Sequence, residues 1–72
     1  MDKIDKLKFF TFASGSIDAV EALWDKTEGN KADAYALVKD HAKTYGLTDL
    51  KDIEIDTALS EINDGMEVEW KS

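Results

Sequence analysis

The clearest hydrophobic pattern lies in the middle of the chain, where apolar residues recur at helical spacing in two adjoining segments. An apolar stripe that includes Val20 and Trp24 predicts an amphipathic helix from about Ile17 to Glu28. Ser16 is a suitable N-cap, because its hydroxyl can accept a hydrogen bond from a backbone N–H of the first turn. Gly29 is typical of the residue that ends a helix.

A second helix follows directly, from Asn30 to about Tyr45. Asn30 can cap it, and Asp33 at the third helical position is a weak capping-box partner. Gly46 with Leu47 behind it is typical of a C-terminal cap that makes a hydrophobic contact back onto the helix. The inner face would consist of Tyr35, Val38, Ala42 and Tyr45. The two helices together predict an αα-hairpin.

Two other segments predict strands. The aromatic run at Leu7–Phe12 does not settle on one helical face, so it favours a strand buried on both sides, with a short N-terminal helix as the alternative. Near the C-terminus, Met66, Val68 and Trp70 alternate with charged residues, which is typical of a half-buried strand. This strand could pair with the first one.

Between the hairpin and the last strand, a helical stripe predicts a third helix that begins at about Asp49 or Asp56 and ends at Asn63. Ile53 and Ile55 alternate as they would in a short strand, so the first part of this stretch stays open between helix and strand. The elements together predict an α+β fold in a single compact domain (1–72), with the αα-hairpin and third helix on a small two- or three-stranded sheet. An all-α arrangement is the alternative. The expected core contains Phe10, Phe12, Val20, Trp24, Tyr35, Val38, Leu59, Ile62 and Trp70.

Composition restricts how the chain is stabilised and where it acts. The sequence has no Cys and no evident metal site, so a small hydrophobic core must supply the stability. The absence of Cys fits a reducing cytoplasm. The mixed charge of the first six residues, followed by a short apolar run, is typical of neither a signal peptide nor a membrane span. We expect a soluble cytoplasmic protein.

Charge is distributed unevenly along the chain. Sixteen carboxylates face nine lysines, there is no arginine, and six of the seven net negative charges fall between Leu47 and Ser72. The acids of this C-terminal third are Asp49, Asp52, Glu54, Asp56, Glu61, Asp64, Glu67 and Glu69. Such a charge balance argues against direct binding to nucleic acids or anionic membranes and favours a basic protein surface as partner.

One motif resembles a known family. The run Gly-Ser-Ile-Asp-Ala-Val-Glu at 15–21 resembles the attachment motif of acyl and peptidyl carrier proteins, in which a Ser at the start of a helix carries phosphopantetheine. Gly15 stands where that family places Asp. The resemblance implies covalent modification of Ser16, whereas the helix alone needs Ser16 only as an N-cap.

Other candidate chemistry is weak. His41 lacks an evident catalytic partner. The alternating acids that begin at Asp52 resemble a calcium loop, but Thr57 and Asn63 stand where an EF-hand needs Gly and Glu. The helical hairpin lacks the basic residues of a DNA-recognition helix. We therefore expect no catalytic residue, no metal and no cofactor.

The sequence predicts a non-enzymatic interaction module whose acidic C-terminal face docks a basic protein surface, with Trp70 as an exposed aromatic anchor. In size and charge alone, the chain is similar to DNA-mimic inhibitors. A carrier domain modified on Ser16 and a self-assembling structural protein are the alternatives.

Overall fold

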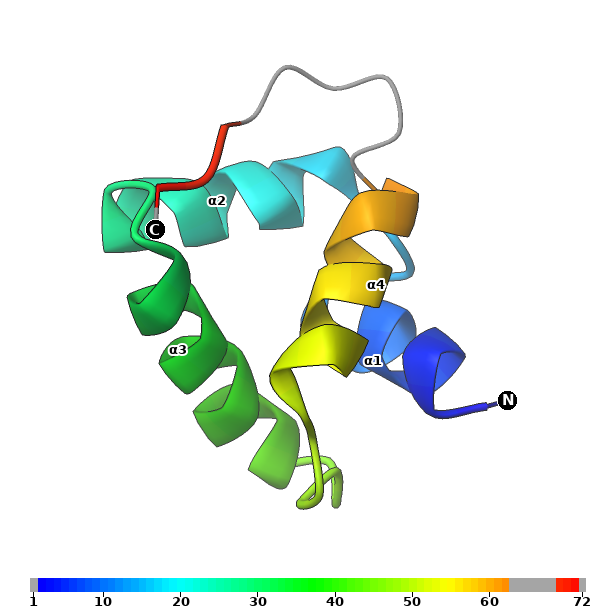
Figure 1. Cartoon of the computed structure of the whole chain (residues 1–72). Coiled ribbons are helices and arrows are strands. Elements are labelled where there is room, and N and C mark those ends of the chain that lie inside the picture. Colours follow the sequence, from blue (N-terminus) through cyan, green and yellow to red (C-terminus); the bar gives the residue numbers. More distant parts are fainter. Residues whose placement is uncertain (1, 63–68, 72) are drawn as a thin grey trace.

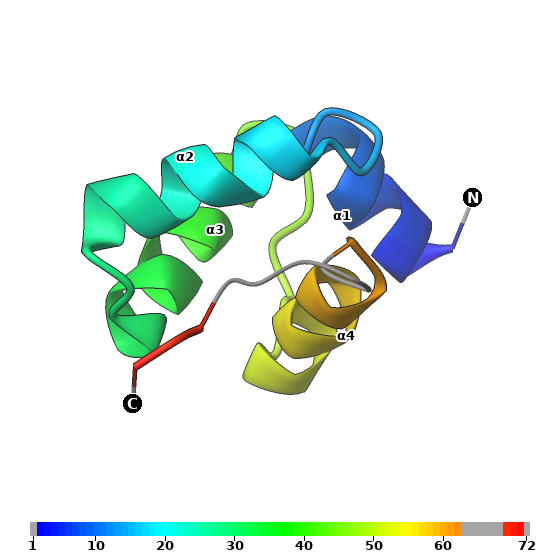
Figure 2. The same cartoon turned by 90° about the horizontal axis from the view of Figure 1, so that it is seen from above.

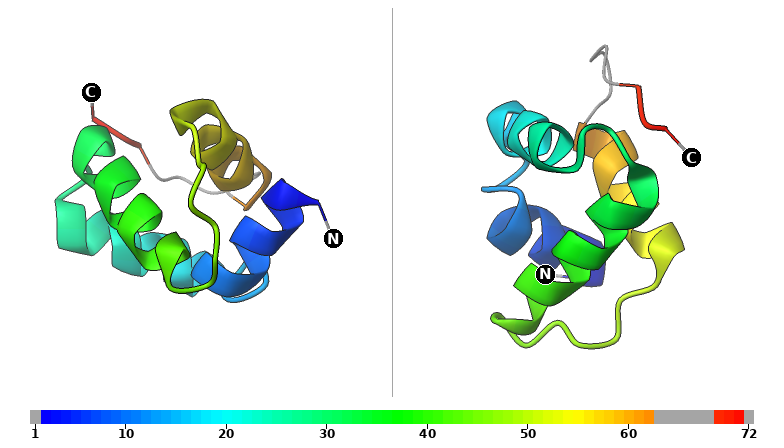
Figure 3. Two further views of the ribbon diagram at one scale, coloured as in Figure 1. Left: turned by 90° about the horizontal axis from the view of Figure 1, so that it is seen from below. Right: turned by 90° about the vertical axis from the view of Figure 1, so that its left-hand side faces the viewer.

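Four α-helices make up the part of the chain that the structure describes. The computed structural model describes residues 2–62 and 69–71, in which the helices are α1 (Lys3–Thr11), α2 (Ile17–Thr27), α3 (Lys31–Lys43) and α4 (Asp52–Ile62). In Figure 1, α2 lies across the top, α3 descends from its C-terminal end, and α1 and α4 lie together on the other side. Figures 2 and 3 show the same pairing of the first and last helices from above, below and the side.

The expected α+β fold is wrong, and the all-α alternative is the architecture observed. The described residues contain no strand; an isolated parallel bridge joins Asn30 to Lys71. The predicted strand at Leu7–Phe12 belongs to α1 and its C-terminal cap, so it has no sheet to join. Of the other predicted strand, residues 66–68 lie outside the described residues, while Trp70 has no strand conformation.

α1 is stabilised by a cap at its first turn, and its apolar residues differ in how deeply they are buried. The carboxylate of Asp2 accepts a hydrogen bond from the backbone N–H of Asp5 (2.8 Å), which satisfies one free N–H at the helix start. Leu7 and Phe12 are fully buried, whereas Phe9 stays 49% exposed. Part of the aromatic run therefore faces the core and part faces outward. Because the apolar residues do not form one stripe, the hydrophobic pattern did not predict a helix.

The helical hairpin is present much as its capping residues predict. Ser16 is the N-cap residue of α2, although its hydroxyl makes no capping hydrogen bond. The side chain of Asn30 accepts from the backbone N–H of Asp33 (3.0 Å) and so caps α3. At the other end of α3, the N–H of Leu47 donates to the carbonyl of Ala42 (3.0 Å). Capping hydrogen bonds therefore mark both ends of α3, whereas α2 begins at Ser16 without a side-chain cap.

The core is shared by all four helices and the turn after α1. Its buried members are Leu7, Phe12, Val20, Val38, Ala42, Ile55, Ala58, Leu59 and Ile62. Five of the expected core residues are among them, while Phe10, Trp24, Tyr35 and Trp70 are only partly buried. The third predicted helix is confirmed as α4, in which Ile55 faces the core and Ile53 is 66% exposed.

Residues 69–71 lie along the turn between α2 and α3, as Figure 1 shows at the C-terminus. The N–H of Lys71 donates to the carbonyl of Gly29 (2.7 Å), and the N–H of Lys31 donates to the carbonyl of Lys71 (2.8 Å). The indole N–H of Trp24 donates to the carbonyl of Glu69 (2.8 Å). Three hydrogen bonds thus fasten this short segment to the hairpin.

Candidate docking surfaces

The carboxylates of α4, which the sequence predicts as part of a docking face, are engaged with lysines of the same chain. The lysines come from α1 and α3, the two helices that flank α4. The pairs are Lys3–Glu54 (3.2 Å), Lys8–Glu61 (2.7 Å), Lys31–Asp56 (3.2 Å) and Lys39–Asp52 (2.7 Å). These pairs link α4 to α1 and α3, and the charge of the acids is partly neutralised before any partner arrives.

The cluster at Asp56 is the most extensive of these contacts. Its carboxylate accepts a hydrogen bond from the hydroxyl of Tyr35 (2.7 Å) as well as the ion pair from Lys31. The hydrogen bond to Asp56 raises the pKa of the Lys31 ammonium, and partial burial raises the pKa of the Tyr35 hydroxyl. Both groups are therefore held in their protonated forms, which links α3 to α4.

Glu54 begins α4 in the manner of a capping box. Its carboxylate accepts a hydrogen bond from the backbone N–H of Lys51 (2.8 Å), three residues earlier. That bond, with a smaller contribution from the ammonium of Lys3, holds the pKa of the Glu54 carboxyl below its usual range. The carboxylate thus serves the helix start and an interhelical pair at once.

The remaining predicted docking residues have varied surroundings. Asp49 is exposed, and its carbonyl accepts from the ammonium of Lys3. Glu69 is also exposed, while Trp70 packs against the core and is only partly exposed, so it is not the freely exposed anchor that the sequence suggested. Asp64 and Glu67 lie outside the described residues. The docking role of this face stays a prediction.

A second acidic surface, which the sequence reading missed, lies on α2. Its carboxylates belong to Asp18, Glu21 and Asp25, whose spacing of three and four residues places them on one side of the helix, and to Glu28, the residue that caps the C-terminal end of α2. All four residues are exposed, and within the described part of the chain none forms an ion pair. We call them the α2 acidic stripe. The spacing could have revealed it, but the near-zero total charge of the first 46 residues concealed it.

An apolar hollow lies next to this stripe. The α2–α3 groove has a volume of about 320 Å³, and the end of α1 closes it. Its lining consists of Thr11, Phe12, Ala19, Ala22, Leu23, Lys26, Leu37, Val38 and His41. Leu37 is 42% exposed, and the hydroxyl of Thr11 is buried without a hydrogen-bond partner among the described residues. The groove is therefore mainly apolar and open to a ligand.

Exposed aromatic rings continue from one end of the groove. The ring of His41 contacts that of Tyr45 edge-on (5.4 Å between centroids), and Tyr45 stacks on Phe10 (4.9 Å). Phe10 in turn meets Phe9 edge-on (5.0 Å). Tyr45 is 45% exposed and Phe9 has a similar exposure, so the apolar surface extends from Leu37 across α3 to α1. Continuous exposed apolar surface is typical of interaction sites.

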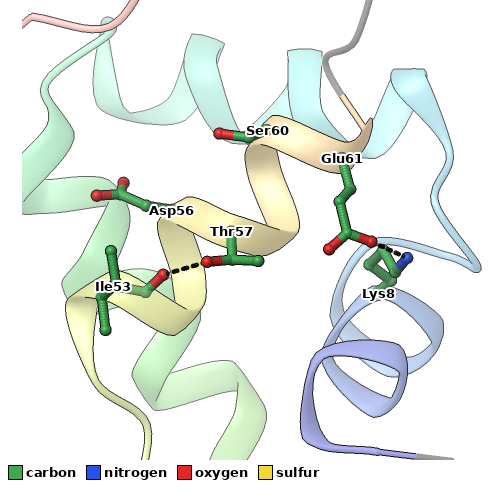
Figure 4. A pocket seen from close by; sticks show the side chains of 6 residues that line it. All are labelled: Lys8, Ile53, Asp56, Thr57, Ser60 and Glu61. Carbon is green, nitrogen blue, oxygen red and sulfur yellow. Dashed lines mark hydrogen bonds and ion pairs between the residues drawn. The ribbon is translucent and has the colours of Figure 1, made fainter.

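The polar hollow in Figure 4 has a different character. It lies along α4 and is lined by Lys8, Ile53, Asp56, Thr57, Ser60 and Glu61. The hydroxyl of Thr57 donates to the carbonyl of Ile53 (2.8 Å), and Lys8 and Glu61 pair with each other (Figure 4). Lys8, Glu61 and Thr57 thus already have partners within the chain.

His41, the one histidine, lines the α2–α3 groove rather than a polar site. Within residues 2–62 and 69–71, His, Asp and Glu side chains nowhere gather as a set of three that could hold a metal ion. None of the helices in the described residues combines the length and apolar character needed to cross a membrane. No known protein family, curated protein or solved structure matches this chain.

Proposed function

We propose that this chain is a non-enzymatic interaction module of the cytoplasm that docks a basic protein surface through the α2 acidic stripe. The observation that carries the proposal is the division of its acids into two sets. The carboxylates of α4 are matched with lysines from α1 and α3, whereas those of the stripe are exposed and unmatched in the described residues. Unmatched charge on one helix face is what a partner of opposite charge would meet first.

The mechanism is electrostatic steering followed by short-range contact. Complementary charge speeds the encounter of two proteins, and salt screens it over about 10 Å at 0.1 M ionic strength.

Capture from cell lysate at low salt, with two charge-reversed variants, tests the proposal. One variant carries Asp18→Lys, Glu21→Lys and Asp25→Lys in the stripe. The matched control carries Asp49→Lys, Glu67→Lys and Glu69→Lys, which changes the net charge equally in the C-terminal third. A basic protein that the stripe variant loses and the control keeps supports the proposal. Loss in the control alone would assign docking to the C-terminal face, and capture unaffected by either variant would refute both.

A carrier domain modified on Ser16 is the second candidate. Ser16 stands at the start of α2, makes no capping hydrogen bond through its hydroxyl, and precedes an acidic helix, which favours access by a modifying enzyme. Intact mass after treatment with a phosphopantetheinyl transferase and coenzyme A tests it. A mass increase that Ser16→Ala abolishes would support a carrier, and an unchanged mass would end that candidate.

A further inference from the structure

The α2–α3 groove has acidic residues on both of its outer edges. On α2, Asp18 and Asp25 stand four residues before and three residues after Ala22, which lines the groove. On α3, Asp33 and Asp40 have the same spacing about Leu37. Residues three and four apart are neighbours on a helix surface, so Ala22 and Leu37 each lie between two carboxylates along their helices. We call these four aspartates the groove rims.

Both rims are available to a ligand. All four aspartates are exposed, and in the described part of the chain none is in an ion pair. Lys26 and His41 also line the groove, and the four rim carboxylates outnumber these two side chains. The groove therefore combines an apolar floor with edges of net negative charge.

We propose that the α2–α3 groove binds one amphipathic helix of a partner protein, with an apolar stripe on its inner side and lysines or arginines along both flanks. The proposal rests on the docking function above and specifies the ligand of that surface. An apolar stripe would enter between α2 and α3, as helix-in-groove ligands do, and basic flanks would meet the groove rims. Charge on two opposite edges selects a ligand with cations on both sides of its apolar stripe, which a helix provides.

The aromatic rings beyond the groove set how far such a helix extends. From Leu37, the apolar surface passes His41 and reaches Tyr45, and Phe10 and Phe9 continue it onto α1. These rings and Leu37 are partly exposed to solvent in the described part of the chain. A ligand helix of several turns would cover both parts, and aromatic side chains are common anchors of interfaces.

Two synthetic peptides of identical composition test the proposal against the whole chain. One peptide of about 14 residues, or four turns, places leucines at helical spacing with lysines on both flanks. The other is the same set of residues scrambled, so that it has equal charge but no apolar stripe. Fluorescence anisotropy should show the amphipathic peptide binding at least about tenfold more tightly than the scrambled one, as burial of an apolar stripe requires.

The outcomes separate this inference from the docking function. Equal binding of the two peptides would show that charge alone attracts basic ligands; the docking function would stand, and the groove would not be its site. No binding of the amphipathic peptide would refute the groove inference, while lysate capture with the stripe variant would still decide the docking function.

Single substitutions locate the binding surface. Leu37→Ser should weaken binding of the amphipathic peptide about tenfold, whereas Ile53→Ser removes an apolar side chain of greater exposure on α4 and should leave binding unchanged. Asp40→Lys on the rim should weaken binding at low salt, and Asp49→Lys should have a smaller effect. Equal effects within either pair would overturn the assignment. Sedimentation velocity of the chain alone is the last check, because a dimer that Leu37→Ser dissociates would make a second copy the occupant.

Discussion

The indole N–H of Trp24 donates a hydrogen bond to the backbone carbonyl of Glu69, across 45 residues of sequence (2.8 Å). The same ring lies against Gly29, and the ammonium of Lys71 is 5.8 Å from its centroid. Trp24 thus joins the end of α2, the turn after it and the C-terminal segment. Substitutions at these positions should reveal how much the fold depends on that junction.

Gly29 should tolerate a side chain less well than Gly46 does. Both residues have positive φ (+78° and +82°), so a methyl group strains either one by about 1 kcal/mol. At Gly29 the added Cβ would also lie 2.8 Å from the Trp24 ring, whereas at Gly46 nothing lies within 4 Å. Urea denaturation should show Gly29→Ala losing roughly 2 kcal/mol or more and Gly46→Ala about half of that. Equal losses would contradict the close packing of Trp24 on this turn.

The two tryptophans should respond differently to replacement by Phe. Trp24→Phe removes a donated hydrogen bond and should cost roughly 1 kcal/mol. It should also speed hydrogen exchange at the Lys31 and Lys71 amides, which hold the C-terminal segment. Trp70→Phe is the control. The buried indole N–H of Trp70 has no hydrogen-bond partner among the described residues, so its removal breaks no hydrogen bond there. Unchanged exchange in Trp24→Phe would show that the segment is fastened without the indole.

Stability should fall in alkaline solution through the cluster of Lys31, Tyr35 and Asp56. The pKa values of Lys31 and Tyr35 are raised from 10.5 and 10.0, so their contributions are complete below these ordinary values and are lost as pH rises through the folded-state pKa values. Tyr35→Phe removes the hydrogen bond to Asp56 and should cost about 1 kcal/mol at neutral pH. Tyr35→Phe should also make the loss of stability above pH 10 less steep, as measured by thermal unfolding. An unaltered alkaline decline would place its origin elsewhere.

In acid, Glu54 should be one of the groups that destabilise the fold. Its folded-state pKa lies below the ordinary 4.5, so its contribution is complete above that value and is lost as pH falls through the folded-state pKa. Glu54→Gln should therefore lower the melting temperature at pH 7. Near pH 3 the melting temperatures of the variant and the parent chain should differ less than they do at pH 7. Glu21→Gln removes an exposed carboxylate of the α2 acidic stripe and should leave the profile unchanged. The same profile for both variants would refute a special role for Glu54.

Two isoleucines of α4 test which side of the helix faces the core. Ile55 is fully buried, so Ile55→Ala should cost about 2–5 kcal/mol. Ile53 is two residues away and 66% exposed, so Ile53→Ala should change stability by less than about 0.5 kcal/mol. Equilibrium denaturation measures both. Similar losses would fit the alternating strand that the sequence also allowed here.

The sequence predicts well those helices whose ends are determined by residues close to one another in the chain. α2 and α3 were predicted because Ser16, Gly29, Asn30 and Gly46 mark their ends through local backbone chemistry. α1 was mistaken for a strand because Phe9 is about half exposed and Phe10 owes its position to a contact outside the helix, its stacking on Tyr45. Tertiary packing therefore decided an element that local pattern could not.

The candidate surfaces depend even more on distant contacts. The acids of the C-terminal third were visible in the sequence, but their lysine partners lie as far away as Lys3 and Lys8 at the other end of the chain. The α2–α3 groove requires the relative placement of three helices, which no periodicity specifies. Only the α2 acidic stripe could have been found from spacing alone.

The pairing of α1 with α4 has a consequence for synthesis on the ribosome. Leu7 and Phe12 of the first helical region are buried in the core together with residues of α4, the last helix along the described part of the chain. At about 5–20 residues per second, α4 is completed roughly 3–10 s after α1. Leu7 and Phe12 are therefore made several seconds before the α4 residues that pack with them in the core. Chaperones that recognise exposed aromatic segments would meet α1 during that interval.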